Sequence, residues 1–114
     1  MKKILSPIES EAIDLLISVL VKYNESAPIK TKPLLAELNA KFSIPNYFVD
    51  TRLRMFCNYL RTNAILPLMS TSKGYFVTEN PAIILNQIKS LVGRADSIDS
   101  CAEGLKVFYK KYTS

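Results

Sequence analysis

The sequence predicts a mainly α-helical protein with one small β-hairpin, and two observations lead to that prediction. Apolar residues recur at helical spacing on either side of residues 65–78, and the first and last of these segments begin at residue types that cap helices. Within residues 65–78 the helical period stops, and two short apolar runs flank a polar stretch that contains glycine. With 114 residues, 48% apolar and 22% charged side chains, the chain has the size and composition of one folded domain.

The first helix is expected to begin after Ser6 and to run to about Tyr23. Ser6 can cap it, Pro7 suits the first helical position, and Glu9 can reach back to the amide of the capping residue. Its apolar face comprises Ile8, Ala12, Leu15, Leu16, Val19 and Leu20. Residues 29–30 are too few for an independent strand, but they can add one edge to a small sheet.

A second, shorter helix is expected to begin near Thr31 or Lys32. Pro33 is tolerated in its first turn, because amides there have no partner within the helix. Its inward stripe comprises Leu34, Leu35, Leu38 and Phe42. After a turn at residues 43–46, Asn46 is expected to cap a third helix that runs to about Asn63.

The hairpin is expected to pair residues 65–70 with residues 75–78. Pro67 cannot donate a ladder hydrogen bond, so its strand should lie at a sheet edge or bulge there. Asn80 and Pro81 then begin a last helix that no later proline interrupts, although Gly93 and Gly104 can mark bends or breaks. Its apolar positions form a heptad seam: Ile84, Ile88, Leu91, Ala95, Ile98, Ala102, Leu105, Tyr109 and Tyr112.

This seam has two physical explanations, and they divide the chain in the same way. Residues 1–79 form the first unit, and residues 80–114 form a helix for packing or dimerisation. The heptads can form a two-stranded coiled coil between two copies of the chain, which is the explanation that we favour. Alternatively, the helix can fold back within one chain and cover the apolar face of the first helix.

The composition excludes several kinds of site. The chain has no histidine, which rules out serine–histidine and cysteine–histidine catalysis and histidine metal sites. Its three glycines are scattered, so they do not form a phosphate-binding loop. Cys57 and Cys101 lack metal-ligand spacing and are expected to be buried thiols rather than a disulfide. No pair of titratable side chains has a recognisable catalytic arrangement, so we expect no enzyme, metal or cofactor.

The N-terminal residues have the charge of a signal peptide, but no apolar segment follows them. The longest apolar stretch, residues 12–21, is interrupted by Asp14 and Ser18 and is too short to span a bilayer. We therefore expect a cytoplasmic protein with no membrane partner.

A helical wheel divides the third helix into two stripes. With Leu53 at the origin, a buried stripe within about 60° comprises Val49, Phe56, Cys57 and Leu60. A polar stripe between about 80° and 160° comprises Tyr47, Thr51, Arg54, Asn58 and Arg61. Such side chains read base edges or hold phosphates. Asp50 lies beside this stripe and would repel phosphate, so we expect it over a base edge or paired with Arg54.

The positive charge is concentrated in the same part of the chain. Residues 30–75 have seven basic and two acidic side chains, a net charge of +5, which equals the net charge of the whole chain. Three of the four arginines fall in the third helix, where bidentate recognition favours arginine over lysine. This localisation favours a polyanionic partner over a merely solvated face. The predicted DNA-binding set is Lys30, Lys32, Tyr47, Thr51, Arg52, Arg54, Asn58, Arg61, Ser72 and Lys73.

The element order of helix, short strand, helix, helix and hairpin wing is that of a winged helix, here followed by a long C-terminal helix. In that fold the third helix enters the major groove of DNA and the hairpin touches the flanking backbone. The motifs that carry a resemblance are Leu53-Arg54, Asn58-Tyr59-Leu60-Arg61, Pro67 and Gly74-Tyr75-Phe76-Val77. They resemble a winged helix-turn-helix family of small proteins linked to phages and mobile elements, over roughly residues 8–80.

The resemblance implies DNA binding by the third helix and the wing, with Arg54 and Arg61 at the arginine positions of the pattern. The chain departs from the pattern in having Leu53 for a valine, and Asn63-Ala64 where a glycine commonly ends the helix. We therefore predict sequence-specific binding of double-stranded DNA, by a transcriptional regulator or an accessory protein of a phage or mobile element. A dimer would place two reading heads on one duplex. The alternative is a protein-interaction module that keeps the winged-helix shape and dimerises through its last helix.

Overall fold

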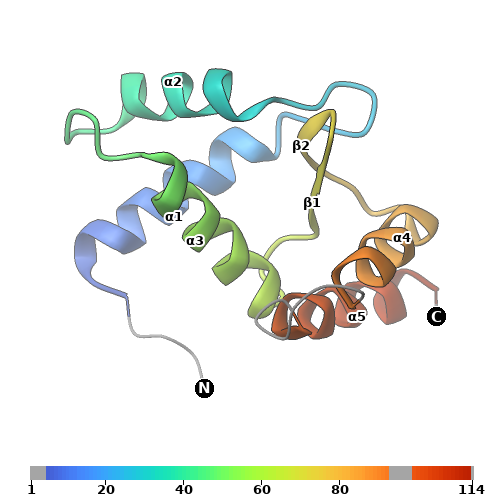
Figure 1. Cartoon of the computed structure of the whole chain (residues 1–114). Helices are drawn as coiled ribbons and strands as arrows, with labels where there is room; N and C mark the ends of the chain where they lie inside the picture. Colours follow the sequence, from blue (N-terminus) through green and yellow to red (C-terminus); the bar gives the residue numbers. More distant parts are fainter. Residues whose placement is uncertain (1–4, 93–98, 114) are drawn as a thin grey trace.

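A computed structural model describes residues 5–92 and 99–113 of the chain (Figure 1). The described residues form five helices and one antiparallel hairpin, which confirms the predicted mainly helical class with a small hairpin. The elements are α1 (Pro7–Leu20), α2 (Thr31–Lys41), α3 (Asp50–Thr62), β1 (Leu68–Thr71), β2 (Gly74–Val77), α4 (Pro81–Val92) and α5 (Asp99–Thr113). None of these helices has the length and apolar character needed to cross a membrane.

The beginnings of α1 and α4 follow their capping residues. The amide of Glu9 donates to Ser6 Oγ at 3.2 Å, and the amide of Ser6 donates to Glu9 Oε1 at 3.0 Å, so the predicted capping box is present. Asn80 Oδ1 likewise accepts from the amide of Ala82 at 3.0 Å, as its predicted capping role requires. The first helix ends at Leu20, three residues before the predicted end at Tyr23.

The third helix begins later than predicted, at Asp50, because Asn46 does not cap it. Asn46 adopts a left-handed conformation with φ of 56°, and the capping position is Val49, which makes no side-chain cap hydrogen bond. Asn39 of α2 explains this start: its amide exchanges two hydrogen bonds of 2.9 Å with the main chain of Phe48. These two hydrogen bonds keep the main chain before Asp50 out of the helix.

The hairpin acquires a third, single-residue edge. Ile29 and Tyr75 exchange main-chain hydrogen bonds of 2.9 and 2.7 Å, so residue 29 pairs with β2 on the side opposite β1. This confirms the predicted sheet edge at residues 29–30. Gly74 is required at this point, because its φ is +125° and a Cβ would lie 2.4 Å from the Ile29 carbonyl oxygen. Pro67 lies just before β1, whose strand begins three residues later than predicted.

Two buried clusters form the core. The first joins α1, α2 and α3 and includes the fully buried Leu16, Leu20, Leu34, Leu38, Leu53, Phe56 and Cys57. The second joins the hairpin to α4 and α5 and comprises Met69, Phe76, Ile84, Ile88, Ala102, Leu105 and Phe108. The side chain of Cys101 lies outside the described residues.

The prediction of one continuous C-terminal helix is wrong. Helices α4 and α5 are separate, and they pack against each other (Figure 1). Four seam residues, Ile84, Ile88, Ala102 and Leu105, are buried inside the chain, and Tyr109 is partly buried. Ala95, Ile98 and the side chain of Leu91 lie outside the described residues. Helix α5 therefore folds back within the chain. It packs on α3 and α4 and not on the apolar face of α1, which the fold-back alternative had predicted.

The physical reason for the fold-back is the hairpin. Met69 and Phe76 present apolar surface on the side of the sheet away from the first cluster. Helices α4 and α5 together bury this surface and their own apolar faces in one cluster.

Candidate nucleic-acid interface

Three of the predicted contact residues lie exposed on α3. Thr51, Arg54 and Asn58 face solvent, and the side chain of Arg54 is 65% exposed. Arg54 Nη2 lies 3.8 Å from Asp50 Oδ2, which matches one of the two roles expected for Asp50. An ion pair this exposed contributes little to stability, about 0.3–0.5 kcal/mol for residues one helical turn apart. Arg54 is therefore held near Asp50 only weakly and can exchange it for another partner.

Tyr47, which was predicted to lie on the polar stripe of the third helix, precedes α3, and both Tyr47 and Arg52 are partly buried against the chain itself. Tyr47 precedes α3 and is half-buried, with its ring centroid 4.9 Å from that of Phe42. The Arg52 guanidinium lies 4.3 Å from the centre of the Tyr47 ring, and its Nη1 donates to the Tyr47 carbonyl at 2.6 Å. This arginine stacks on and fixes the loop before α3.

The position of Arg61 differs most from the helical-wheel prediction. Its side chain was expected to face outward, yet the residue is only 6% exposed. Its Nη1 donates to Ser70 Oγ and its Nη2 to Asn58 Oδ1, each at 3.3 Å. The wheel fails here because α5 and β1 pack against α3 and cover its C-terminal end, which a local pattern does not reveal.

The beginning of α2 and the tip of the hairpin form one open groove of about 730 Å³. Its lining residues are Pro28, Ile29, Lys30, Thr31, Lys32, Pro33, Thr71, Ser72 and Gly74. The sequence marked Lys30, Lys32 and Ser72 as separate candidates, and the structure brings them together. The pairing of Ile29 with Tyr75 does this, because it fixes the start of α2 beside β2.

Charge around this groove is not compensated by nearby acids. The ammonium groups of Lys30, Lys32 and Lys73 make no ion pair with any residue in the described ranges, and all three residues are exposed. Lys30 is also the capping residue of α2 and offers no side-chain acceptor to the first amides of the helix. The partial positive charge of a helix N-terminus therefore adds to that of the lysines.

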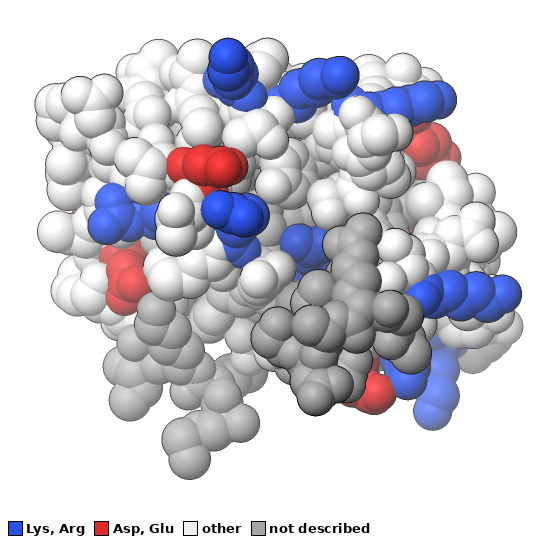
Figure 2. Space-filling model, viewed as in Figure 1, with Lys and Arg blue, Asp and Glu red and all other residues white. Residues whose placement is uncertain are grey.

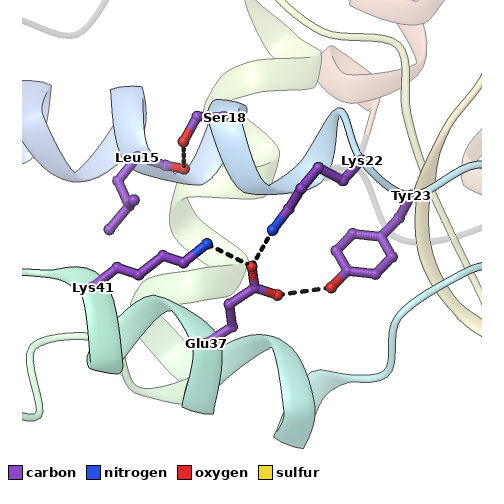
Figure 3. A network of polar contacts seen from close by, with 6 residues as sticks. All are labelled: Leu15, Ser18, Lys22, Tyr23, Glu37 and Lys41. Atoms are coloured by element: carbon purple, nitrogen blue, oxygen red, sulfur yellow. Dashed lines mark hydrogen bonds and ion pairs between the residues drawn. The ribbon is translucent and has the colours of Figure 1, made fainter.

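Two other lysines pair with a single carboxylate that the sequence did not single out, that of Glu37 (Figure 3). Glu37 of α2 accepts hydrogen bonds from Tyr23 Oη at 2.7 Å, from Lys41 Nζ at 2.9 Å and from Lys22 Nζ. These donors, with Lys22 foremost, lower the pKa of Glu37 to about 2, and the bond to Glu37 raises the pKa of Tyr23. The spacing of Glu37 and Lys41, four residues apart in a helix, was the one available sequence signal.

The charge of residues 30–75 is thus distributed unevenly. Lys41 is paired with Glu37, Arg54 lies near Asp50, and Arg61 is buried. Lys30, Lys32 and Lys73, around the α2–hairpin groove, are exposed and make no ion pair in the described part of the chain. Figure 2 shows basic side chains spread over the face that carries α2 and α3, with acidic side chains between some of them.

Comparisons of this chain with protein-family models, with curated proteins and with solved structures found no match. The case for a function therefore depends on the described geometry.

Proposed function

We propose that this chain is a winged helix that binds double-stranded DNA, with α3 in the major groove and the β1–β2 hairpin as the wing. The order of the elements supports this proposal, since a helix, a one-residue sheet edge, two helices and a hairpin follow in turn. The sheet order supports it as well, because β2 lies between residue 29 and β1. The transcriptional and mobile-element settings that the resemblance implies both require this activity.

The observation that carries the proposal is the groove where α2 and the hairpin tip meet. It gathers Lys30, Lys32 and Ser72 from segments about forty residues apart, with Lys73 at the adjacent tip. Two lysines, a helix N-terminus and a hydroxyl are suited to phosphate oxygens, and they carry no information about base sequence. We assign phosphate contacts to these residues and to the exposed hydroxyl of Thr51.

Base recognition falls to two exposed side chains of α3. Arg54 can pair bidentately with guanine, and Asn58 can pair bidentately with adenine. Both lie on the part of the helix that neither α5 nor the hairpin covers, which is why they remain exposed. Tyr47, Arg52 and Arg61 are left out of this set, because each is wholly or partly buried and contacts other residues of the chain.

The alternative function required an exposed heptad seam as the working surface. Ile84, Ile88, Ala102 and Leu105 are buried within one chain, so a coiled coil through them would cost the second core cluster. For this reason we do not propose the interaction module.

Duplex binding as a function of salt tests the proposal. If phosphates are contacted, the logarithm of the binding constant falls linearly with the logarithm of salt concentration, by about 0.9 for each contact. The triple variant K30A/K32A/K73A should bind more weakly and show a shallower slope. The matched control K89A/K106A/K110A removes the same charge from exposed positions of α4 and α5 and should keep the slope. Absence of duplex binding at low salt, or equal effects of the two triples, would refute the proposal.

A further inference from the structure

Arg61 is buried where α3 meets β1, in surroundings that are poor for a charged group. Its two hydrogen-bond partners, Ser70 and Asn58, are neutral, and its Nε has no partner within the described part of the chain. A buried cation without a carboxylate is commonly no more stable than an apolar side chain of the same volume. Stability alone therefore does not explain an arginine at this position.

The contacts of Arg61 form a continuous polar chain from α4 to the exposed face of α3. Gln87 of α4 is buried, and its Oε1 accepts from the amide of Ser70 at 2.8 Å. Ser70 Oγ accepts from Arg61 Nη1, and Arg61 Nη2 donates to Asn58 Oδ1. Arg61 thus links Ser70 of the hairpin to Asn58, one of the two residues to which we assign base recognition.

A guanidinium constrains the orientation of its acceptor. Arginine only donates hydrogen bonds, so the atom of Asn58 that faces Arg61 must be the carbonyl oxygen and not the amide nitrogen. An asparagine that reads adenine must present its oxygen and its nitrogen in a fixed order. Without Arg61, the two orientations of the amide would differ less in energy.

We propose that Arg61 is a positioning residue that fixes the side-chain amide of Asn58 for base recognition, without itself contacting DNA. This inference rests on the proposed function, and it assigns to Arg61 a role in specificity rather than in affinity. The planar fork suits this role because it bonds Ser70 and Asn58 at once.

The test begins with a duplex selected from random sequences by the unaltered protein. The substitution Asn58→Ala identifies the base pair at which Asn58 discriminates, which a bidentate contact does by roughly 5- to 150-fold. Arg61→Met should lower discrimination at that same base pair by about 3- to 10-fold, which is part of the discrimination that Asn58 provides. Affinity for random duplex and the salt slope should stay unchanged, because Arg61 contacts no phosphate.

Three further proteins make the result decisive. In the N58A background, R61M should cause no additional loss of discrimination, since its effect passes through Asn58. Arg61→Lys retains the charge but has one nitrogen in place of the fork, so it should also lose discrimination, and it replaces R61M if that variant fails to fold. Arg52→Met is the matched control. Arg52 is also an arginine of α3, but it packs on Tyr47, so this variant should keep the preference at that base pair.

Two outcomes would overturn the inference while leaving DNA binding intact. One is an unaltered base preference in R61M and R61K. The other is a salt slope that falls by about 0.9 in R61M, since this would make Arg61 a direct phosphate contact. Failure of the unaltered protein to bind any duplex would instead remove the proposed function and, with it, this inference.

Discussion

Gly104 of α5 lies against the main-chain carbonyl of Arg61 in α3, so closely that a Cβ at residue 104 would be 1.7 Å from that oxygen. A helix interior normally disfavours glycine by about 1 kcal/mol relative to alanine. Here the missing Cβ lets two helix backbones touch. This contact seats α5 over the end of α3, at the residue whose side chain the wheel had placed in solvent.

Gly104→Ala is therefore expected to destabilise the protein, although helix propensity alone predicts a gain. Because the contacted atom is main chain, α5 must shift, and overpacking of this kind costs about 1–3 kcal/mol. Urea unfolding measures the change in the free energy of unfolding. Glu103→Ala, at the neighbouring exposed position, should change it by less than about 1 kcal/mol. Equal stability of G104A and the unaltered protein would contradict the described α3–α5 packing.

Ala64→Gly is expected to stabilise the protein. Ala64 has a φ of 51° at the end of α3, where the amides of Ala64 and Ile65 donate to the carbonyls of Arg61 and Leu60. Glycine is favoured at this left-handed position, so the change should raise the free energy of unfolding by about 0.5–1 kcal/mol. Thermal unfolding measures it. Ala36→Gly, at an exposed position within α2, should instead lower stability by about 1 kcal/mol, and losses of similar size in both variants would argue against the left-handed end of α3.

The Glu37 cluster predicts a pH dependence of stability. Its pKa is lowered from 4.5 to about 2 in the folded state, so its stabilising effect is complete above about pH 5 and is lost as the pH falls towards 2. The side chain is 20% exposed and its lysine partners face solvent, so we expect an effect of about 1 kcal/mol. Urea unfolding of E37Q between pH 2 and 6 should show this acid-dependent component removed.

Tyr23→Phe provides a graded comparison for Glu37. It removes one of the three donors, so it should reduce the acid-dependent component without abolishing it. A pH profile of E37Q that matches that of the unaltered protein would contradict the described cluster.

Arg54→Ala should distinguish base recognition from phosphate binding. If Arg54 reads a base, the variant loses about 1–3 kcal/mol of binding free energy on the selected duplex and relaxes its preference at one base pair. Competition binding against duplexes altered at single positions measures this. An equal loss on every duplex would assign Arg54 to phosphate, together with Lys30 and Lys32.

Local signals predicted those parts of the fold that depend on neighbouring residues. Ser6 with Glu9 and Asn80 with Ala82 fixed the starts of two helices, because a cap needs side-chain and main-chain groups within three residues. Asn46 is a suitable capping residue by type, yet Asn39, seven residues earlier, holds Phe48 and moves the start of α3 to Asp50. The residues next to Asn46 in the sequence do not reveal such a competing contact.

The candidate site shows the same division. Thr51, Arg54 and Asn58 could be found on a wheel, since their exposure depends on α3 alone over that part of its length. The groove at Lys30, Lys32 and Ser72 could not, because it depends on a main-chain pairing between residues 29 and 75. Glu37 was missed for a similar reason: two of its three partners lie beyond the end of α1.

By itself the sequence determined the helical class, the position of the hairpin and the membership of the heptad seam, of which the described residues are buried or partly buried. Only the tertiary structure decided that the described seam residues pack within one chain, that Arg61 is buried and that Lys30, Lys32 and Ser72 meet at one groove. Periodicity is a local property that says which side chains share a face of a helix. What covers that face is decided by contacts between segments far apart in the chain, such as Gly104 against Arg61.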